Sequence, residues 1–211
     1  MKKIPTIFER DWEGDRSRVI NVPNQEAEWV HAGEGWATRK MDGTCCLVQG
    51  GRLFKRRELR PKDTTPPEFV EADFDATTGK RIGWMPIGDG PEDRWHREAF
   101  DNLGNAAVDG ETYELVGPKI QGNPEKFNEH VLLLHAACER LDEIRTFGGL
   151  REWLATQDIE GIVWHHPDGR MAKIKLRDFG LRRENAHYAH PEGTSVEPHG
   201  ADGAKDPANG A

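Results

Sequence analysis

Lys40, Asp42 and Gly43 form the first of four short segments whose residue types could do chemistry. The lysine ends a segment of β-type composition, and the aspartate and glycine after it are typical of a tight turn. A lysine amine in such a place can act as a nucleophile when it is neutral. The same three residue types are common in ordinary turns, so this motif taken alone favours a turn without catalytic function.

Two glutamates, Glu111 and Glu114, belong to a second segment of β-type composition. Their odd spacing places them on opposite faces of a strand. One carboxylate can therefore face a pocket while the other faces solvent. Taken alone, this segment favours two exposed glutamates.

The third and fourth segments lie close together in the sequence. Glu160 opens an otherwise apolar run, and burying it without a partner would be costly. We therefore expect it at the rim of a site or bound to a cation, with a solvated strand start as the alternative. Lys173 and Lys175 lie two residues apart and share one strand face, which is either solvent-facing or an anion site.

The order of these segments resembles the covalent nucleotidyltransferase superfamily of polynucleotide ligases and mRNA capping enzymes. The resemblance covers most of residues 36–181. Three stretches are similar to the vertebrate-type 5′-to-3′ RNA ligase family, whose nucleotidyl motif also reads Lys-x-Asp-Gly-Thr-Cys-Cys. These stretches are WATRKMDGTCCLV, ELVGPKIQGNP and IEGIVWHHPDGRMAKIK.

The resemblance implies that Lys40 attacks the α-phosphate of ATP, which forms a lysyl-AMP and releases pyrophosphate. The pKa of this lysine would have to fall, and Lys173, Lys175 and a bound Mg²⁺ would lower it. Glu160 would help to hold the metal, Mg²⁺ or alternatively Mn²⁺. Lys173 and Lys175 would bind the α-phosphate and stabilise its developing charge.

Three further roles follow from the same resemblance. Asp42 would steer the site or contact the metal indirectly. Arg56 would contact the ribose or a phosphate; Arg57 is the alternative, because strand alternation lets only one of them face inward. Glu114 would accept hydrogen bonds from the ribose hydroxyls, with Glu111 as the alternative.

The sequence also departs from its relatives. Cys45 stands where many of them carry an arginine, so a phosphate contact must come from elsewhere. DNA ligases and capping enzymes of this superfamily carry an OB domain after the Lys-x-Lys strand, and only a short segment remains here. The resemblance thus implies an RNA ligase that joins an RNA 5′-phosphate to a 3′-hydroxyl.

Two other functions stay open from the sequence. One is a DNA ligase or another polynucleotide adenylyltransferase, and the other is a non-catalytic module that binds nucleotides or RNA ends. No side chain that selects ATP over GTP can be identified.

The elements that would position these residues predict an α+β fold of mostly antiparallel sheets with flanking helices. The resemblance implies a nucleotidyltransferase (ATP-grasp-like) fold without an OB domain. Gly50-Gly51 predicts a hairpin turn. Segment 131–141 fits either a strand or a helix. Predicted strands are 36–40, 44–49, 52–57, 112–117, 160–166 and 171–176, and predicted helices are 91–103 and 150–157.

The chain of 211 residues is predicted to comprise a ligase domain at 1–183 and a disordered acidic tail at 184–211. Seven Trp and eight Phe argue against a wholly disordered chain. The net charge of −8 means that any grip on RNA must be a local patch. Two basic blocks are candidates: Lys55, Arg56, Arg57, Arg60 and Lys62, and Lys173, Lys175, Arg177, Arg182 and Arg183.

The three cysteines are odd in number and form no CxxC pair, so neither a disulfide framework nor a zinc cluster is predicted. This favours a reducing, cytoplasmic location. The sequence contains no apolar run long enough for a membrane span. We expect a monomer whose partner is RNA with 5′-phosphate and 3′-hydroxyl ends.

Overall fold

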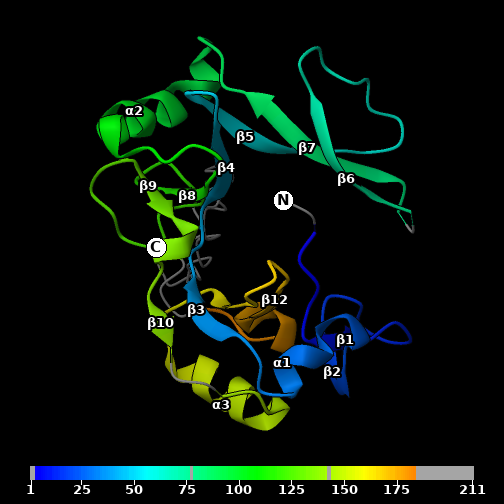
Figure 1. Ribbon diagram of the computed structural model, residues 1–211. Helices are drawn as coiled ribbons and strands as arrows, with labels where there is room; N and C mark the ends of the chain where they lie inside the picture. Colours follow the sequence, from blue (N-terminus) through cyan, green and yellow to red (C-terminus); the bar gives the residue numbers. More distant parts are fainter. Residues whose placement is uncertain (1–2, 77, 142–143, 184–211) are drawn as a thin grey trace, which may run out of the picture.

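The computed structural model describes residues 3–76, 78–141 and 144–183 (Figure 1). Within them the chain is α+β, with two main sheets of antiparallel strand pairs and a few helices packed against them. This confirms the predicted fold class. The predicted tail at 184–211 lies outside the described residues, so the division of the chain at residue 183 stays a prediction.

The large sheet has six strands in the order β6-β7-β5-β4-β8-β9. Gly50 and Gly51 have φ of 58° and 69°, as the predicted hairpin between β4 and β5 requires. Helix α2 (Arg94–Leu103) packs on this sheet through the fully buried Ala99. The strands are β4 (Thr44–Gln49), β5 (Arg52–Leu59), β6 (Val70–Asp75), β7 (Lys80–Pro86), β8 (Thr112–Val116) and β9 (Val131–Leu134).

The small sheet has four strands in the order β10-β3-β11-β12. Its strands are β3 (Trp36–Lys40), β10 (Arg140–Leu141), β11 (Gly161–His165) and β12 (Met171–Lys175). A second core joins this sheet to α1 (Glu28–His31) and α3 (Phe147–Thr156). Trp164 and Ile174 are fully buried there. The Thr146 side chain accepts a hydrogen bond from Gly149 N–H and caps α3.

Shorter elements complete the described part of the chain. A two-stranded sheet packs beside the small sheet and consists of β1 (Phe8–Arg10) and β2 (Val19–Pro23). The 3₁₀ turns are η1 (Gln25–Ala27), η2 (Pro91–Asp93), η3 (Gly104–Ala106), η4 (His135–Ala137) and η5 (Leu176–Phe179).

Most of the predicted elements are present at nearly their predicted bounds. The ambiguous segment 131–141 is strand β9, turn η4 and the short strand β10, and contains no α-helix. The predicted helix at 91–103 begins as the 3₁₀ turn η2 before α2 starts. Strands β1, β2, β6 and β7 were not predicted. None of the described helices is long and apolar enough to cross a membrane.

The connection between β3 and β4 links the two sheets. Strand β3 ends at Lys40 in the small sheet, and β4 starts at Thr44 in the large sheet (Figure 1). Only residues 41–43 lie between them. The first chemical motif therefore occupies the crossing point from one sheet to the other.

Candidate active site

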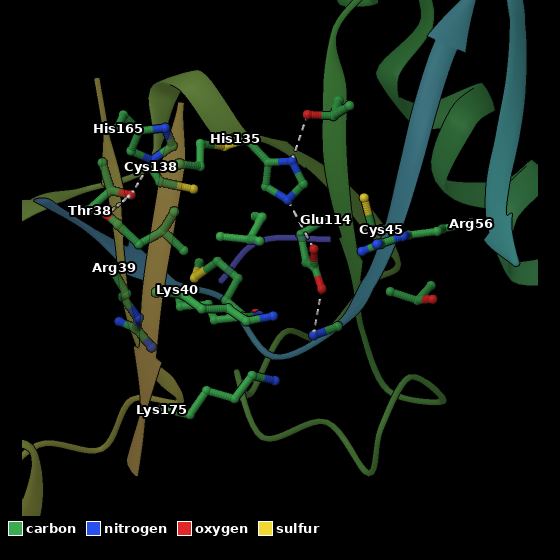
Figure 2. Close-up of a pocket in the computed structure, with 18 of the residues that line it drawn as sticks. Thr38, Arg39, Lys40, Cys45, Arg56, Glu114, His135, Cys138, His165 and Lys175 are labelled. Atoms are coloured by element: carbon green, nitrogen blue, oxygen red, sulfur yellow. Dashed lines mark hydrogen bonds and ion pairs between the residues drawn. The ribbon is translucent and has the colours of Figure 1, made fainter. Parts of the chain in front are cut away.

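A pocket of about 480 Å³ opens between the large and the small sheet. This volume lies within the range of roughly 300–1,000 Å³ typical of small-molecule sites. Figure 2 shows Lys40 and Lys175 on one side of the pocket and Glu114, Cys45 and Arg56 on the other. The first two residues end strands of the small sheet, and the other three belong to the large sheet. The two sheets thus supply the two walls of the pocket.

Glu160 joins the amines of Lys40 and Lys175. Its Oε2 lies 2.6 Å from Lys40 Nζ, and its Oε1 forms an ion pair with Lys175 Nζ. The next residue, Gly161, pairs with Lys40 of β3 on one side and with Lys175 of β12 on the other. A Cβ at Gly161 would overlap the carbonyl oxygen of Ile174. The Glu-Gly pair therefore brings three strand ends together.

The lysines of the pocket differ in their pKa. Burial lowers the pKa of Lys40, but Glu160 and Glu114 raise it by more, so that it lies above its usual value. The expectation that the Lys40 pKa falls is therefore wrong for this arrangement of the pocket. The lysine with the lowered pKa is Lys173, at about 8, because of burial and then the charges of Lys175 and Lys40.

Glu114, and not Glu111, faces the pocket. Glu114 is only 7% exposed, whereas Glu111 stands directly before β8 and is exposed. Glu114 Oε1 accepts a hydrogen bond of 3.1 Å from Gly43 N–H, and Glu114 Oε2 lies 2.9 Å from His135 Nε2. The carboxylate thus contacts the turn that follows Lys40.

Arg56 lines the pocket and Arg57 is exposed, as strand alternation predicted for one of the two. Lys55 of the same basic block points elsewhere. Its Nζ lies 2.5 Å from Asp93 Oδ1, and only 3% of the Asp93 side chain is exposed. This lysine therefore helps to tie strand β5 to the start of helix α2.

A buried carboxylate, Glu125, holds the segment around Asp42. Its Oε1 accepts hydrogen bonds from the Asp42 backbone N–H at 3.1 Å and from Arg183 at 2.9 Å. Its Oε2 forms an ion pair of 2.5 Å with Arg39. Only 1% of the Glu125 side chain is exposed. The crossing between the sheets is thus fastened on one side by Glu125 and on the other by Glu114.

Glu125 and His135 were missed as site residues. Glu125 stands in a loop between Pro124 and Lys126, where an acid is normally exposed. A signal was nevertheless present, because the stretch ELVGPKIQGNP ends directly before it. His135 gave no signal, since segment 131–141 could not be assigned to a strand.

Glu160 and Asp42 are the carboxylates near Lys40 that could hold a metal ion. Burial and then the charge of Glu160 raise the pKa of Asp42. Both line a second pocket next to the first. Hard carboxylate oxygens combined with substrate phosphates are the ligands that Mg²⁺ prefers.

A family model described as RNA ligase 1 matches residues 93–192. RNA ligase 1 of Rattus norvegicus is 25% identical to the chain, over 69% of this chain and 67% of the relative. RNA ligase 1 of Danio rerio is 24% identical, over 86% of this chain and 81% of the relative. The resemblance to the RNA ligase 1 family is confirmed.

The segment that matches the RNA ligase 1 family model contains only part of the candidate site. Glu114, Glu160, Lys173 and Lys175 lie within it, whereas Lys40 precedes it. The structure brings this lysine to the matched residues through the pairing of β3 with β11. The family match and the nucleotidyl motif thus meet at one pocket.

We predict that Glu125→Gln lowers the free energy of unfolding by about 3 kcal/mol, because a buried carboxylate loses its charge beside two guanidinium groups. Urea denaturation followed by circular dichroism measures this change. Glu129→Gln is the matched control, because Glu129 is exposed a few residues away, and it should leave the stability unchanged. Equal stability of the two variants would contradict the role given to Glu125.

A second prediction concerns the pH dependence of stability. The pKa of Lys173 is about 8 in the folded chain against a usual 10.5, so the unfolded chain binds more protons between these values. Stability therefore gains from this group as the pH rises from about 8 to 10.5. Lys173→Met has no amine to titrate, so its free energy of unfolding should lack this increase. The free energy of unfolding of the wild type should therefore rise relative to that of Lys173→Met between about pH 8 and 10.5. Denaturation curves at several pH values test this, and a constant difference would exclude a lowered pKa.

Proposed function

We propose that the chain is an ATP-dependent RNA ligase that acts through a lysyl-AMP at Lys40. In the first step, a bond forms between Lys40 Nζ and the α-phosphorus of ATP. The bond from that phosphorus to the bridging oxygen breaks, and pyrophosphate leaves. AMP then passes to an RNA 5′-phosphate, and attack by a 3′-hydroxyl releases it. The observation that carries the proposal is the meeting of Lys40 and Lys175 in a pocket of nucleotide size, with Glu160 of the neighbouring pocket paired to both amines.

The surrounding residues fit distinct tasks in the first step. Lys40 must lose a proton before it attacks, and Glu160, whose Oε2 lies 2.6 Å from Lys40 Nζ, keeps that proton on the amine while the pair is intact. Because Glu160 is the carboxylate that most raises the Lys40 pKa, this pKa falls once the carboxylate is engaged elsewhere. Lys173 and Lys175 line the pocket and suit the charge that develops on the α-phosphate.

The opposite wall of the pocket suits the nucleoside part of ATP. Glu114 can accept hydrogen bonds from the ribose hydroxyls, and Arg56 can contact the ribose or a phosphate. Mg²⁺ held by Glu160, with Asp42 close by, would supply positive charge for the phosphates when bound.

RNA as the acceptor is supported by the RNA ligase 1 relatives and by two arginines. Arg177 and Arg182 are exposed and line the second pocket together with Asp42 and Glu160. Within the described part of the chain, neither guanidinium has an ion-pair partner, whereas the neighbouring Arg183 is held by Glu125 and Asp158. The two guanidinium groups also line a further pocket with Arg16, in which Arg10 and Arg18 are paired with Asp178 and Asp15. Guanidinium groups bind phosphates in bidentate geometry, so these arginines suit the RNA 5′-phosphate and the nucleotides near it.

Lys40→Ala should abolish self-labelling. The protein is incubated with α-labelled ATP and Mg²⁺, denatured, and scored for retained label, which the wild type and the exposed-lysine control Lys119→Ala should both keep. Equal labelling of Lys40→Ala and the wild type would overturn the proposal. ATP binding without any covalent adduct would favour the non-catalytic binding module instead.

The arginine pair should matter for RNA and not for ATP. Replacing both Arg177 and Arg182 by alanine should leave self-adenylation intact and weaken sealing of 5′-phosphorylated RNA by about a hundredfold or more, since each charge-assisted contact contributes roughly 1.5–3 kcal/mol. Arg151→Ala, at an exposed arginine of helix α3 outside both basic blocks, serves as the control. The same assay offers nicked DNA, nicked RNA and single-stranded RNA in parallel. Preference for nicked DNA would favour the DNA ligase alternative.

A further inference from the structure

Three potential metal ligands gather on the large-sheet wall of the pocket. They are Cys45 Sγ, a Glu114 carboxylate oxygen and a His135 ring nitrogen, all within 4.8 Å of one another. Cys45 and Glu114 are direct cross-strand partners on β4 and β8, so their side chains share one face. His135 follows strand β9, which pairs with the other edge of β8. Figure 2 shows the three side chains converging on one region of the pocket.

The histidine is oriented as a metal ligand normally is. His135 Nδ1 lies 2.9 Å from the Thr112 hydroxyl, and Nε2 lies 2.9 Å from Glu114 Oε2. Metal-binding histidines usually donate the N–H of one ring nitrogen to an acceptor, which fixes the tautomer and aims the other nitrogen at the metal. Without a metal, Nε2–H donates to Glu114 and Nδ1 accepts from the Thr112 hydroxyl. Metal binding would replace the Nε2 proton, and Nδ1–H would then donate to Thr112. A cation between the two would attract both.

The donor set selects a class of metal. Thiolate, imidazole and carboxylate together are typical ligands of Zn²⁺, whereas Mg²⁺ prefers oxygen ligands only. Three protein ligands that face an open pocket leave a fourth position free, as in zinc sites that exchange a ligand. We propose that Cys45, Glu114 and His135 form a Zn²⁺ site within this pocket, separate from the Glu160 carboxylate.

Binding at this site requires the Cys45 thiol to lose its proton to solvent. Burial and then Glu114 raise the pKa of this thiol to about 12 when no metal is bound, while Arg56 and Lys40 act in the opposite direction. Zn²⁺ and the proton therefore compete for the sulfur, so affinity rises with pH. The same burial leaves the thiol unreactive without a metal.

The site has a consequence that rests on the proposed function. Glu114 is the residue assigned to the ribose of ATP, and a carboxylate bound to Zn²⁺ is not available to the ribose hydroxyls. Zn²⁺ and ATP should therefore exclude each other. Zinc would act as a reversible inhibitor of self-adenylation that excess ATP overcomes.

Cobalt provides a direct probe, because Co²⁺ occupies zinc sites and a thiolate ligand gives an intense charge-transfer absorption. We expect the full chain to show this absorption with one Co²⁺ bound, and Zn²⁺ but not excess Mg²⁺ to remove it. Histidines in the 184–211 segment cannot produce the signal, since that segment contains no cysteine.

Substitutions identify the sulfur and the nitrogen. Cys45→Ser should abolish the charge-transfer band, and His135→Gln should weaken cobalt binding at least about tenfold, since even a lost outer-shell partner costs 10–100-fold. Cys138→Ser is the matched control, because Cys138 also lines the pocket but is not part of the cluster, and it should keep the band. Circular dichroism verifies that each variant is folded, and His135→Gln serves if Cys45→Ser is not.

The outcomes separate this inference from the proposed function. No thiolate band in the wild type, or a band that survives in Cys45→Ser, overturns the zinc site whatever the result of the labelling assay. Failure of Lys40 to become labelled overturns the ligase proposal and leaves the cobalt spectrum intact. With both intact, pre-bound ATP should reduce cobalt binding, and unchanged binding would refute their competition.

Discussion

The carboxylate of Glu160 is the interaction on which the rest of the candidate site depends. It bridges the amines of Lys40 and Lys175, which end two strands on either side of β11. Without it, two buried cations would face each other with Lys173 nearby, at a substantial electrostatic cost. The carboxylate thus allows a cluster of lysines to be buried together, and it also keeps the nucleophile protonated.

The backbone supports this arrangement at two points. Gly161 lets β11 and β12 approach more closely than any side chain would permit. Glu125 fastens the crossing between the sheets through Asp42 N–H and the flanking guanidinium groups. A glycine and a buried loop acid, neither of them reactive, thereby fix the position of the reactive lysine.

The sequence predicted much of this site, because its chemistry is carried by local motifs. Strand alternation restricted the choice to Arg56 or Arg57 and to Glu111 or Glu114, and the structure selected Arg56 and Glu114. Interactions between distant segments could not be read in this way. The contacts of Glu125, the position of His135 beside Cys45, and the sign of the Lys40 pKa shift all depend on which segments meet across the two sheets. The β6–β7 hairpin was also not predicted, because the two segments have only a weak β-type pattern. Strand β7 is placed by its backbone pairing with β5 and β6.

The chain passes from one sheet to the other directly after Lys40, with only residues 41–43 between the strands. The width of the pocket is therefore set by the angle between two sheets that share no strand. A molecule that touches Glu114 on one wall and Lys175 on the other acts as a brace between them. Because the chain crosses between the sheets again from β9 to β10, such a molecule would add a third link to the two that the backbone provides.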